Sequence, residues 1–405
     1  MADPGFQGAN RINLIRPDAP FLARPGRFRV GVRTDKFTHH AQLDVLNVTA
    51  TKRPLCDRPL TVETWYPAAE DVNDGTVYDT LLRDGVTPTR LTGGACRDAP
   101  CAAGRFALVV ISHGYPGNRY LMAHLGENLA SKGYVVAAVD HTDSLYQDKA
   151  DFASTLVNRP LDQRFVIDCL ADGAHPLAAI TDCSAVGVIG YSMGAYGALV
   201  FGGAGVSEAA LTLERGDRFE MLARHRAGCA DHAAGVDSRV KAIVPIGPWG
   251  AQHGIWDMAG LAGISTPTFL IGGSSDTTSD YQHGIRRIFD GLRGCQSHLL
   301  TFIAAGHNAA APIPAPIESW QPSAALDFVP FDHYADAVWD TVRMNNITQH
   351  FVTAFLGLHL KDDAAMGQFL TMPPSDAAAD QPRDWPGFAQ GTALGLNFET
   401  RAPQI

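Results

Sequence analysis

The sequence predicts an α/β fold with a mainly parallel sheet and helices on both of its faces. Two observations lead to this class. From residue 105 onward, short apolar runs rich in Val and Ile alternate with segments of helical spacing. The runs are continuously apolar, as expected for parallel strands buried on both faces. A third observation adds antiparallel strands near the N-terminus, where two extended runs alternate in part.

The two N-terminal runs are RFRVGVRT, residues 27–34, and LTVETWYP, residues 60–67. Their β-branched and aromatic residues favour strands, and their partial alternation is typical of a sheet edge. We expect them to be antiparallel edge strands. The polar stretch 77–101 that follows has the composition of an irregular surface loop.

The alternating region then supplies the elements of the parallel sheet. The expected buried strands are RFALVVISHG (105–114), YVVAAVDH (134–141), AVGVIGYS (185–192), VKAIVPIGPWG (240–250), TPTFLIGGSSD (266–276) and SHLLTFIAAGH (297–307). The expected helices are RYLMAHLGENLASKGY (119–134, with Gly133 as its C-cap), DQRFVIDCLADG (162–173), MGAYGALVFGG (193–203), DYQHGIRRIFDGLRG (280–294) and NNITQHFVTAFLGLHLK (345–361).

We expect a single domain over residues 1–405, with an N-terminal extension at 1–25. Two segments interrupt the alternation. Residues 206–239 carry helix-like polar sequence and are expected as a cap or surface insertion. Residues 309–342 are rich in Pro and Ala and are expected to wrap the surface near a site at the carboxyl ends of the strands, where ligands of such sheets bind.

Composition argues against several classes of partner. The net charge is −10 and no basic cluster stands out, so we expect neither nucleic acid nor an anionic membrane surface as a partner. No run of about 18 apolar residues predicts a transmembrane helix. The first residues lack the features of a signal peptide, so the protein is either cytoplasmic or begins after a removed signal. The oligomeric state is left open.

Seven cysteines leave the redox state open. Cys96 and Cys101 bracket a short polar loop and could close a small ring, and Cys169 and Cys183 form a second candidate pair. An odd number of cysteines in a large chain is also typical of buried free thiols.

The pentapeptide Gly190-Tyr191-Ser192-Met193-Gly194 lies where a predicted strand passes into a predicted helix. This is the context of a nucleophile elbow, a tight turn that holds a serine above the sheet. Glycines two residues away on either side leave room for the strained turn. The helix that follows presents its free N–H groups to a developing anion. We therefore predict Ser192 as the nucleophile.

A serine nucleophile needs a base, and the base needs an orienting acid. The next strands end at Asp276 and His307, on the edge of the sheet that also holds Ser192. The order Ser, Asp, His follows the chain order of such hydrolases. We predict His307 as the base and Asp276 as its partner, whereas Asp280 is the better N-cap for the helix after it.

Two backbone N–H groups are the predicted donors to the oxyanion, those of Met193 and of Tyr115 in the loop Ser112–Gly117. His113 and His141 are expected to brace this loop by hydrogen bonds. Trp249 is predicted to form an apolar wall of the pocket, with simple packing as an equal alternative. No metal-binding motif and no phosphate-binding loop in the right context appears, so no metal or cofactor is expected.

The stretches VVISHGYPGNRYLMAHLGENLASKGYVVAAVDH, GVIGYSMGAYGAL, PWG and GHN resemble bacterial esterases related to platelet-activating factor acetylhydrolase and predicted dienelactone hydrolases. The resemblance covers roughly residues 26–365 and implies the α/β-hydrolase fold and hydrolysis of carboxylic esters through an acyl-enzyme. Polyester-degrading enzymes occur among such hydrolases. Dienelactone hydrolases use cysteine, whereas position 192 is serine, so lactone specificity is not transferred.

The expected substrates are esters with short to medium acyl groups, including polymeric esters. Two other functions stay open. The first is an amidase or peptidase of the same fold. The second is a binding protein that has the fold and no catalysis.

Overall fold

The computed structural model describes residues 10–70, 72, 75–150, 152–213, 220–372 and 384–404. The strands are β1 (Arg29–Leu43), β2 (Leu55–Ala68), β3 (Thr76–Leu81), β4 (Pro88–Gly93), β5 (Cys96–Arg97), β6 (Phe106–Ser112), β7 (Tyr134–Asp140), β8 (Thr181–Tyr191), β9 (Val240–Ile246), β10 (Thr268–Gly273), β11 (Ser297–Phe302) and β12 (Leu396–Arg401). The α-helices are α1 (Ala123–Ser131), α2 (Phe152–Ala171), α3 (Met193–Phe201), α4 (Ala230–Gly235), α5 (Met258–Ala262), α6 (Arg287–Gly291) and α7 (Thr341–Leu360).

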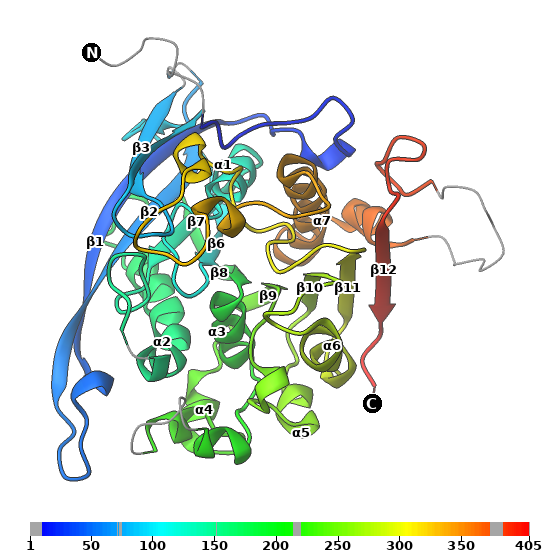
Figure 1. The fold of residues 1–405 in the computed structure, drawn as a ribbon. Helices are drawn as coiled ribbons and strands as arrows, with labels where there is room; N and C mark the ends of the chain where they lie inside the picture. The colour runs from blue at the N-terminus through cyan, green and yellow to red at the C-terminus, as the bar shows by residue number, and fades with distance from the viewer. Residues whose placement is uncertain are drawn as a thin grey trace.

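Ten strands form one sheet in the order β12-β11-β10-β9-β8-β6-β7-β2-β1-β5 (Figure 1). The central strands β7 to β11 are parallel, whereas β2 pairs antiparallel with β7 and β12 pairs antiparallel with β11. Every residue of β6 and β7 is buried, as a strand covered on both faces requires. The predicted fold class is confirmed.

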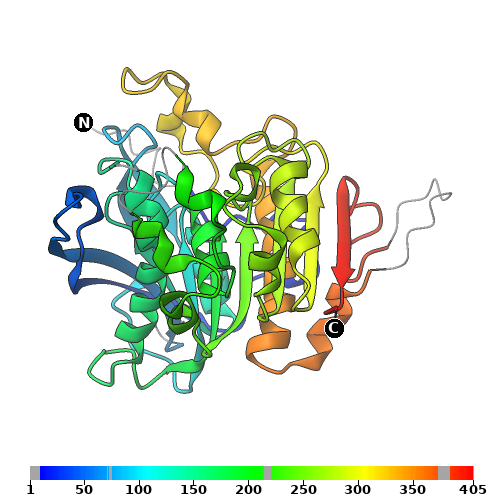
Figure 2. The same ribbon diagram turned by 90° about the horizontal axis from the view of Figure 1, so that it is seen from below.

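Helices cover both faces of the sheet (Figures 1 and 2). Buried side chains of α1 and α7 share one apolar core with one face, and those of α2, α3 and α6 share a second core with the other face. Helix α1 ends near Gly133, whose φ of +82° supports its predicted place at the end of this helix.

Two local predictions were wrong, and one predicted helix is longer than expected. The stretch 77–101 is not an irregular loop, because β3 and β4 pair there as a hairpin and β5 joins the sheet. Tertiary contacts stabilise the hairpin, since the buried Tyr78 hydroxyl donates to Glu127 and accepts from Trp65. Strand β2 is not an edge, since it lies between β1 and β7. Helix α2 starts ten residues before the predicted segment at 162 and runs through Pro160.

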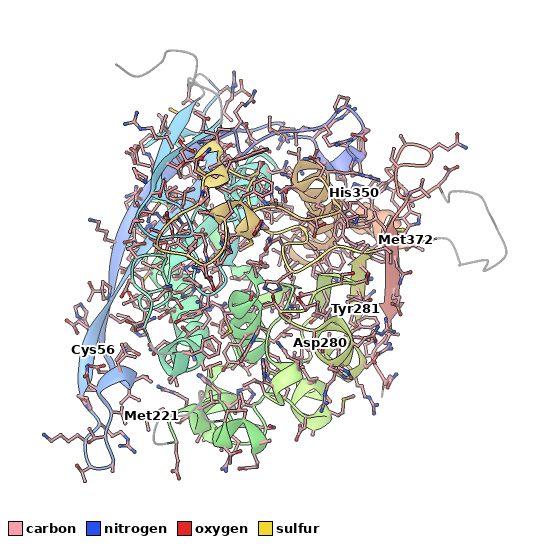
Figure 3. The ribbon with its side chains drawn as sticks, viewed as in Figure 1. Cys56, Met221, Asp280, Tyr281, His350 and Met372 are labelled. Carbon is pink, nitrogen blue, oxygen red and sulfur yellow. The ribbon has the colours of Figure 1, made fainter. Side chains whose placement is uncertain are left out.

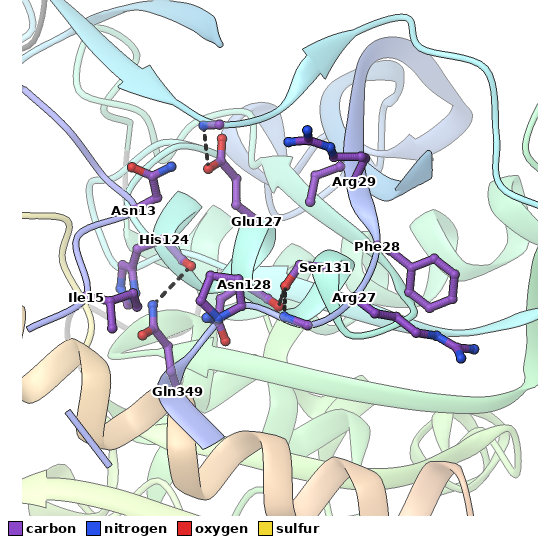
Figure 4. A pocket seen from close by; sticks show the side chains of 14 residues that line it. Asn13, Ile15, Arg27, Phe28, Arg29, His124, Glu127, Asn128, Ser131 and Gln349 are labelled. Carbon is purple, nitrogen blue, oxygen red and sulfur yellow. Dashed lines mark hydrogen bonds between the residues drawn. The ribbon is translucent and has the colours of Figure 1, made fainter. Parts of the chain in front are cut away.

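The described part of the N-terminal extension runs across α1 and α7. Arg16 N donates to the Asn346 side chain, and Leu22 N donates to Nδ1 of His350, a residue labelled in Figure 3. Between this segment, α1 and α7 lies a pocket of about 350 Å³ (Figure 4). Most of its buried polar groups bind protein partners, as when Ser131 Oγ accepts from Gly26 N.

The two predicted insertions occupy different places. Residues 309–342 follow His307 and contain short 3₁₀ turns at Ile317–Trp320 and Pro330–His333. The described part of 206–239 packs beside α2 and the end of α3, where His225 Nε2 donates to Val157 O and His232 contacts Gly203 O.

All seven cysteines lie among the described residues and are free thiols, so neither candidate pair is bonded. Cys56, on the long β1–β2 ribbon, is labelled in Figure 3. Within the described ranges, no helix combines the length and hydropathy needed to span a bilayer.

Candidate active site

Ser192 lies at the turn between β8 and α3. Its φ of +53° and ψ of −110° are strained for a residue with a side chain. The flanking glycines make the turn possible: a Cβ at Gly190 would overlap the Gly194 carbonyl, and a Cβ at Gly194 would overlap the Ser112 carbonyl. The local geometry therefore matches the nucleophile elbow that the sequence predicts.

The three predicted side chains meet above this turn. His307 Nε2 lies 3.0 Å from Ser192 Oγ, and His307 Nδ1 lies 2.8 Å from Asp276 Oδ2. Asp276 is 4% exposed and Ser192 is 8% exposed, so the chain of hydrogen bonds is largely shielded from water. A carboxylate, an imidazole and a hydroxyl in this order can move a proton from the serine to the histidine.

The loop after β10 fixes Asp276. The second carboxylate oxygen, Oδ1, accepts from the backbone N–H groups of Thr278 and Ser279. Asp276 therefore closes a turn and orients His307 with separate oxygens. Asp280, labelled in Figure 3, accepts from Gln282 N and His283 N and caps the following helical turn, as the sequence predicts.

Residues of the 309–342 segment hold the His307 loop. Asp336 Oδ2 accepts from Gly306 N, and the Asn308 side chain donates to the carbonyls of Asp332 and Ala335. Tyr191, next to the nucleophile, donates to Asn308 Oδ1. Burial raises the pKa of Tyr191 well above its usual value, and the Asp276 carboxylate adds to this effect. The histidine loop is thus anchored from both sides.

The loop that contains Tyr115 lies against the elbow. A Cβ built on Gly114 would lie 3.2 Å from the Tyr191 ring and 3.4 Å from Ser192 Cβ, so the loop lies directly against the elbow. Met193 is the first residue of α3, and its N–H has no partner within the helix. The two predicted oxyanion donors therefore belong to backbone segments that both border Ser192.

An aromatic wall adjoins the nucleophile. Trp249 N donates to Ser192 O, and the Trp249 ring packs edge to face on Phe152 at 4.9 Å. Phe152 in turn contacts the ring of Tyr115, and the His253 ring lies tilted beside that of Trp249. Sequence reasoning named Trp249 but missed Phe152 and His253. No local pattern signals Phe152, because the start of α2, which places this ring beside the oxyanion loop, depends on contacts far along the chain.

Among the described residues, no three His, Cys, Asp or Glu side chains are grouped as a metal site would need. The parallel sheet with antiparallel ends, the serine turn after β8, and the acid and histidine after β10 and β11 together define an α/β-hydrolase fold.

Comparison with known proteins agrees with this class. A family model described as "PETase: PET hydrolase-like" matches residues 84–211, which include Tyr115, Ser192 and Met193. A solved structure, "Ferulic acid esterase from Streptomyces cinnamoneus", aligns with a TM-score of 0.60 at 20% identity, covering 96% of this chain and 99% of that chain. At this identity the alignment shows a shared fold.

Two curated relatives are similar over part of their length. "Cutinase est1" of Thermobifida alba is 28% identical over 185 residues, 46% of this chain and 47% of the relative. "Bis(hydroxyethyl) terephthalate hydrolase" of Streptomyces coelicolor is 26% identical over 189 residues, 47% of this chain and 46% of the relative. The chain thus spans about half the length of the curated relatives it matches. The more specific resemblance to platelet-activating factor acetylhydrolases and dienelactone hydrolases stays a prediction.

Proposed function

We propose that the protein hydrolyses carboxylic esters through an acyl-enzyme. The observation that carries this proposal is the continuous set of contacts from Asp276 through His307 to Ser192. A serine hydroxyl is a weak nucleophile near neutral pH, and a histidine within hydrogen-bond reach supplies the base that it lacks.

In the proposed mechanism, Ser192 Oγ attacks the ester carbonyl and its proton moves to His307 Nε2. Asp276 keeps the imidazole in the tautomer with a proton on Nδ1 and stabilises the imidazolium that forms. The N–H groups of Met193 and Tyr115 donate to the tetrahedral oxyanion. His307 then protonates the leaving alkoxide, which departs as the alcohol. Water attacks the acyl-enzyme in the same manner and releases the acid.

We further propose that the substrates include aromatic diesters and polyesters. The names of the relatives, two of which are a cutinase and a terephthalate ester hydrolase, support this class of substrate. The rings of Trp249, Phe152 and Tyr115 offer apolar surface beside Ser192, on which an aromatic acyl group can pack. Simple esters with short to medium acyl groups fit the same arrangement.

Substitution of the nucleophile tests the proposal. Ser192→Ala should abolish hydrolysis of p-nitrophenyl butyrate and of bis(hydroxyethyl) terephthalate and should prevent labelling by a fluorophosphonate probe. The matched control is Ser184→Ala, which changes an exposed serine and should retain activity and labelling. Full activity in Ser192→Ala would overturn the mechanism.

A matched pair of ester and amide substrates separates the proposed activity from that of an amidase. Faster turnover of the amide would assign the site to amide hydrolysis. Wild-type protein that is neither labelled nor active would be a binding protein with this fold.

A further inference from the structure

We propose that His113 and Arg159 are positioning residues that orient the N–H of Tyr115 toward the oxyanion. Neither side chain contacts Ser192 Oγ or His307 in the hydrogen bonds of the described residues. Both side chains are buried and form hydrogen bonds to backbone carbonyls of the loop Ser112–Gly117. This inference rests on the proposed ester hydrolysis and assigns a cause to the geometry of its second oxyanion donor.

The hydrogen bonds of His113 fix the tautomer of its ring. Nδ1 lies 2.7 Å from Gly114 O, and because a carbonyl oxygen only accepts, Nδ1 must carry the proton. Nε2 then accepts from the backbone N–H of His141 at 3.2 Å. Burial, with the Arg159 cation nearby, holds the pKa of His113 well below its usual value, so the ring is neutral. Both ring nitrogens therefore form hydrogen bonds to the backbone, Nδ1 to Gly114 O and Nε2 to His141 N.

This arrangement determines where the Tyr115 N–H points. Gly114 O and Tyr115 N belong to the same peptide unit, which is trans. In a trans unit the C=O and N–H point in opposite directions. When His113 Nδ1 holds Gly114 O toward the protein interior, the Tyr115 N–H is directed away from His113. Gly114 lies against Tyr191 and Ser192 of the elbow, and from this neighbourhood we infer that the side of the peptide opposite His113 faces the nucleophile.

Arg159, on α2, holds the preceding peptide. Its Nη1 donates to His113 O at 2.6 Å, while Nη2 donates to Ser144 Oγ at 2.8 Å and approaches Gly114 O at 3.5 Å. The side chain is 1% exposed. The described hydrogen bonds and ion pairs give it carbonyl and hydroxyl partners but no carboxylate. A buried cation costs several kcal/mol, and here Nη1 is bonded to the loop while Nη2 is shared between the loop and Ser144.

The support beneath the loop is itself anchored. His141 contacts Ser112 Oγ through Nε2 and Asp162 Oδ2 through Nδ1, each at 2.8 Å, and Arg58 pairs with Asp162. This set repeats the residue types of the active site, but Ser112 and Asp162 are fully buried and His141 is 1% exposed. Substrate cannot reach these groups, so they serve as a rigid base for His113 and the loop.

The loop is shaped to this ring. A Cβ on Gly117 would lie 2.6 Å from His113 Nδ1, so the chain passes over the imidazole where only glycine fits. The chain thus lies against His113 both before Tyr115, at Gly114 O, and after it, at Gly117, and rotation of the Tyr115 N–H requires loss of the bond to Gly114 O.

Two substitutions at position 113 separate positioning from general structural support. In His113→Asn the amide nitrogen can occupy the place of Nδ1 and still donate to Gly114 O. In His113→Gln the amide reaches the place of Nε2 and leaves Gly114 O without its donor. We expect His113→Gln to lower kcat on p-nitrophenyl butyrate about 100-fold with little change in KM, the size of effect seen when one oxyanion donor is lost. His113→Asn should recover most of the activity.

A boronic acid inhibitor supplies a second readout, because its tetrahedral adduct with the serine places an oxygen in the oxyanion site. Its inhibition constant should rise in His113→Gln and in Arg159→Met in proportion to the loss of kcat/KM. A product-like acid that forms no adduct should bind as before. Equal loss in His113→Asn and His113→Gln, or unchanged boronate affinity, would overturn the assignment.

Wild-type protein tests the same idea without any substitution. Nitrogen-15 NMR of the His113 ring should show the neutral tautomer protonated at Nδ1, and the opposite tautomer would overturn the proposal. If the wild type hydrolyses esters while the variants at 113 match it within about twofold, only the positioning role fails. If the wild type shows no ester hydrolysis, the proposed function fails and the positioning role falls with it.

Discussion

Backbone strain at the nucleophile depends on two glycines. Gly190 and Gly194 each lie where a Cβ would overlap a carbonyl group of the elbow or of β6. Gly190→Ala and Gly194→Ala should each lower the free energy of unfolding by about 1–3 kcal/mol, as overpacking does. Urea unfolding measures this change.

Activity should fall with stability in these variants, because a shifted elbow moves Ser192 away from His307. Gly173→Ala is the control, since a Cβ there meets nothing within 4 Å. Unchanged stability and turnover in Gly194→Ala would show that the turn tolerates a side chain, contrary to this account.

Asp276 orients His307 through charge and geometry together. In Asp276→Asn the amide oxygen can still accept hydrogen bonds from the N–H groups of Thr278 and Ser279. The amide NH₂ group then faces His307 Nδ1. That donor favours the tautomer with a proton on Nε2, which cannot accept the proton of Ser192. We expect kcat to fall on the order of 10⁴-fold with little change in thermal stability.

The matched control is Asp280→Asn, which alters a carboxylate that caps the next helical turn. Its activity should stay near that of the wild type. Steady-state kinetics on p-nitrophenyl butyrate compare the two variants. Comparable losses in both would point to disruption of the loop as a whole, and the orienting role of Asp276 would then be wrong.

At the scale of elements, β12 closes the sheet beside β11. Its Phe398 ring packs against Phe269 at 5.9 Å and against Phe351 of α7 at 5.2 Å. Phe398→Ala should lower the free energy of unfolding by roughly 1–3 kcal/mol, less than for a fully buried ring because Phe398 is half-buried. Urea unfolding measures the loss.

The side chain of the neighbouring Asn397 is exposed, so Asn397→Ala is the control. This variant should unfold with a free energy within about 0.5 kcal/mol of the wild type. Turnover by folded protein should be the same in both variants, since β12 lies at the end of the sheet remote from β8. A Phe398→Ala variant as stable as the control would mean that β12 adds little to the core.

The parallel elements were predictable because their signals are local. Buried parallel strands appear in the sequence as continuous apolar runs. Because the carboxyl ends of such strands meet at one edge of the sheet, Ser192, Asp276 and His307 could be placed together from the sequence alone. The β3–β4 hairpin and the start of α2 could not be predicted, because they depend on partners far along the chain. Tyr78 is held by Glu127, and Arg159 of α2 by the His113 carbonyl.

The same limit applied to the site. His113 and His141 could be expected to brace the oxyanion loop from their positions after two strands. The participation of Arg159 could not be expected, because an arginine within a helix can have many partners. Only the fold brings this side chain beneath the loop. We propose a single domain, because strands from β1 to β12 join one ten-stranded sheet and the two apolar cores of the described residues pack on its opposite faces.

For the molecule as a whole, buried histidines set the response to acid. Burial lowers the pKa of His124, His225 and His298 to about 4 and that of His350 to about 3. In the unfolded chain these rings titrate near 6.5. Between about pH 6.5 and pH 4 the unfolded state therefore binds more protons than the folded state. Stability is full above pH 6.5 and falls as the pH drops through this window.

The size of this effect follows from the differences in pKa. One pKa unit corresponds to about 1.4 kcal/mol, so each such histidine removes on the order of 3 kcal/mol between pH 7 and pH 4. A domain stabilised by about 5–15 kcal/mol cannot withstand several of these losses. We expect the urea midpoint to decline from about pH 6.5 and the protein to unfold before most carboxylates titrate.

One histidine can be isolated from the others. His225 donates through Nε2 to Val157 O, and a glutamine amide can replace this donor without titrating. His225→Gln should therefore reduce the slope of unfolding free energy against pH by up to one proton between pH 6 and pH 4.5. Gln282→Ala, which changes an exposed side chain that does not titrate, should leave the slope as it is. A urea midpoint that stays constant from pH 7 to pH 4.5 in the wild type would show that these rings are protonated in the folded state, and the account of acid stability would be wrong.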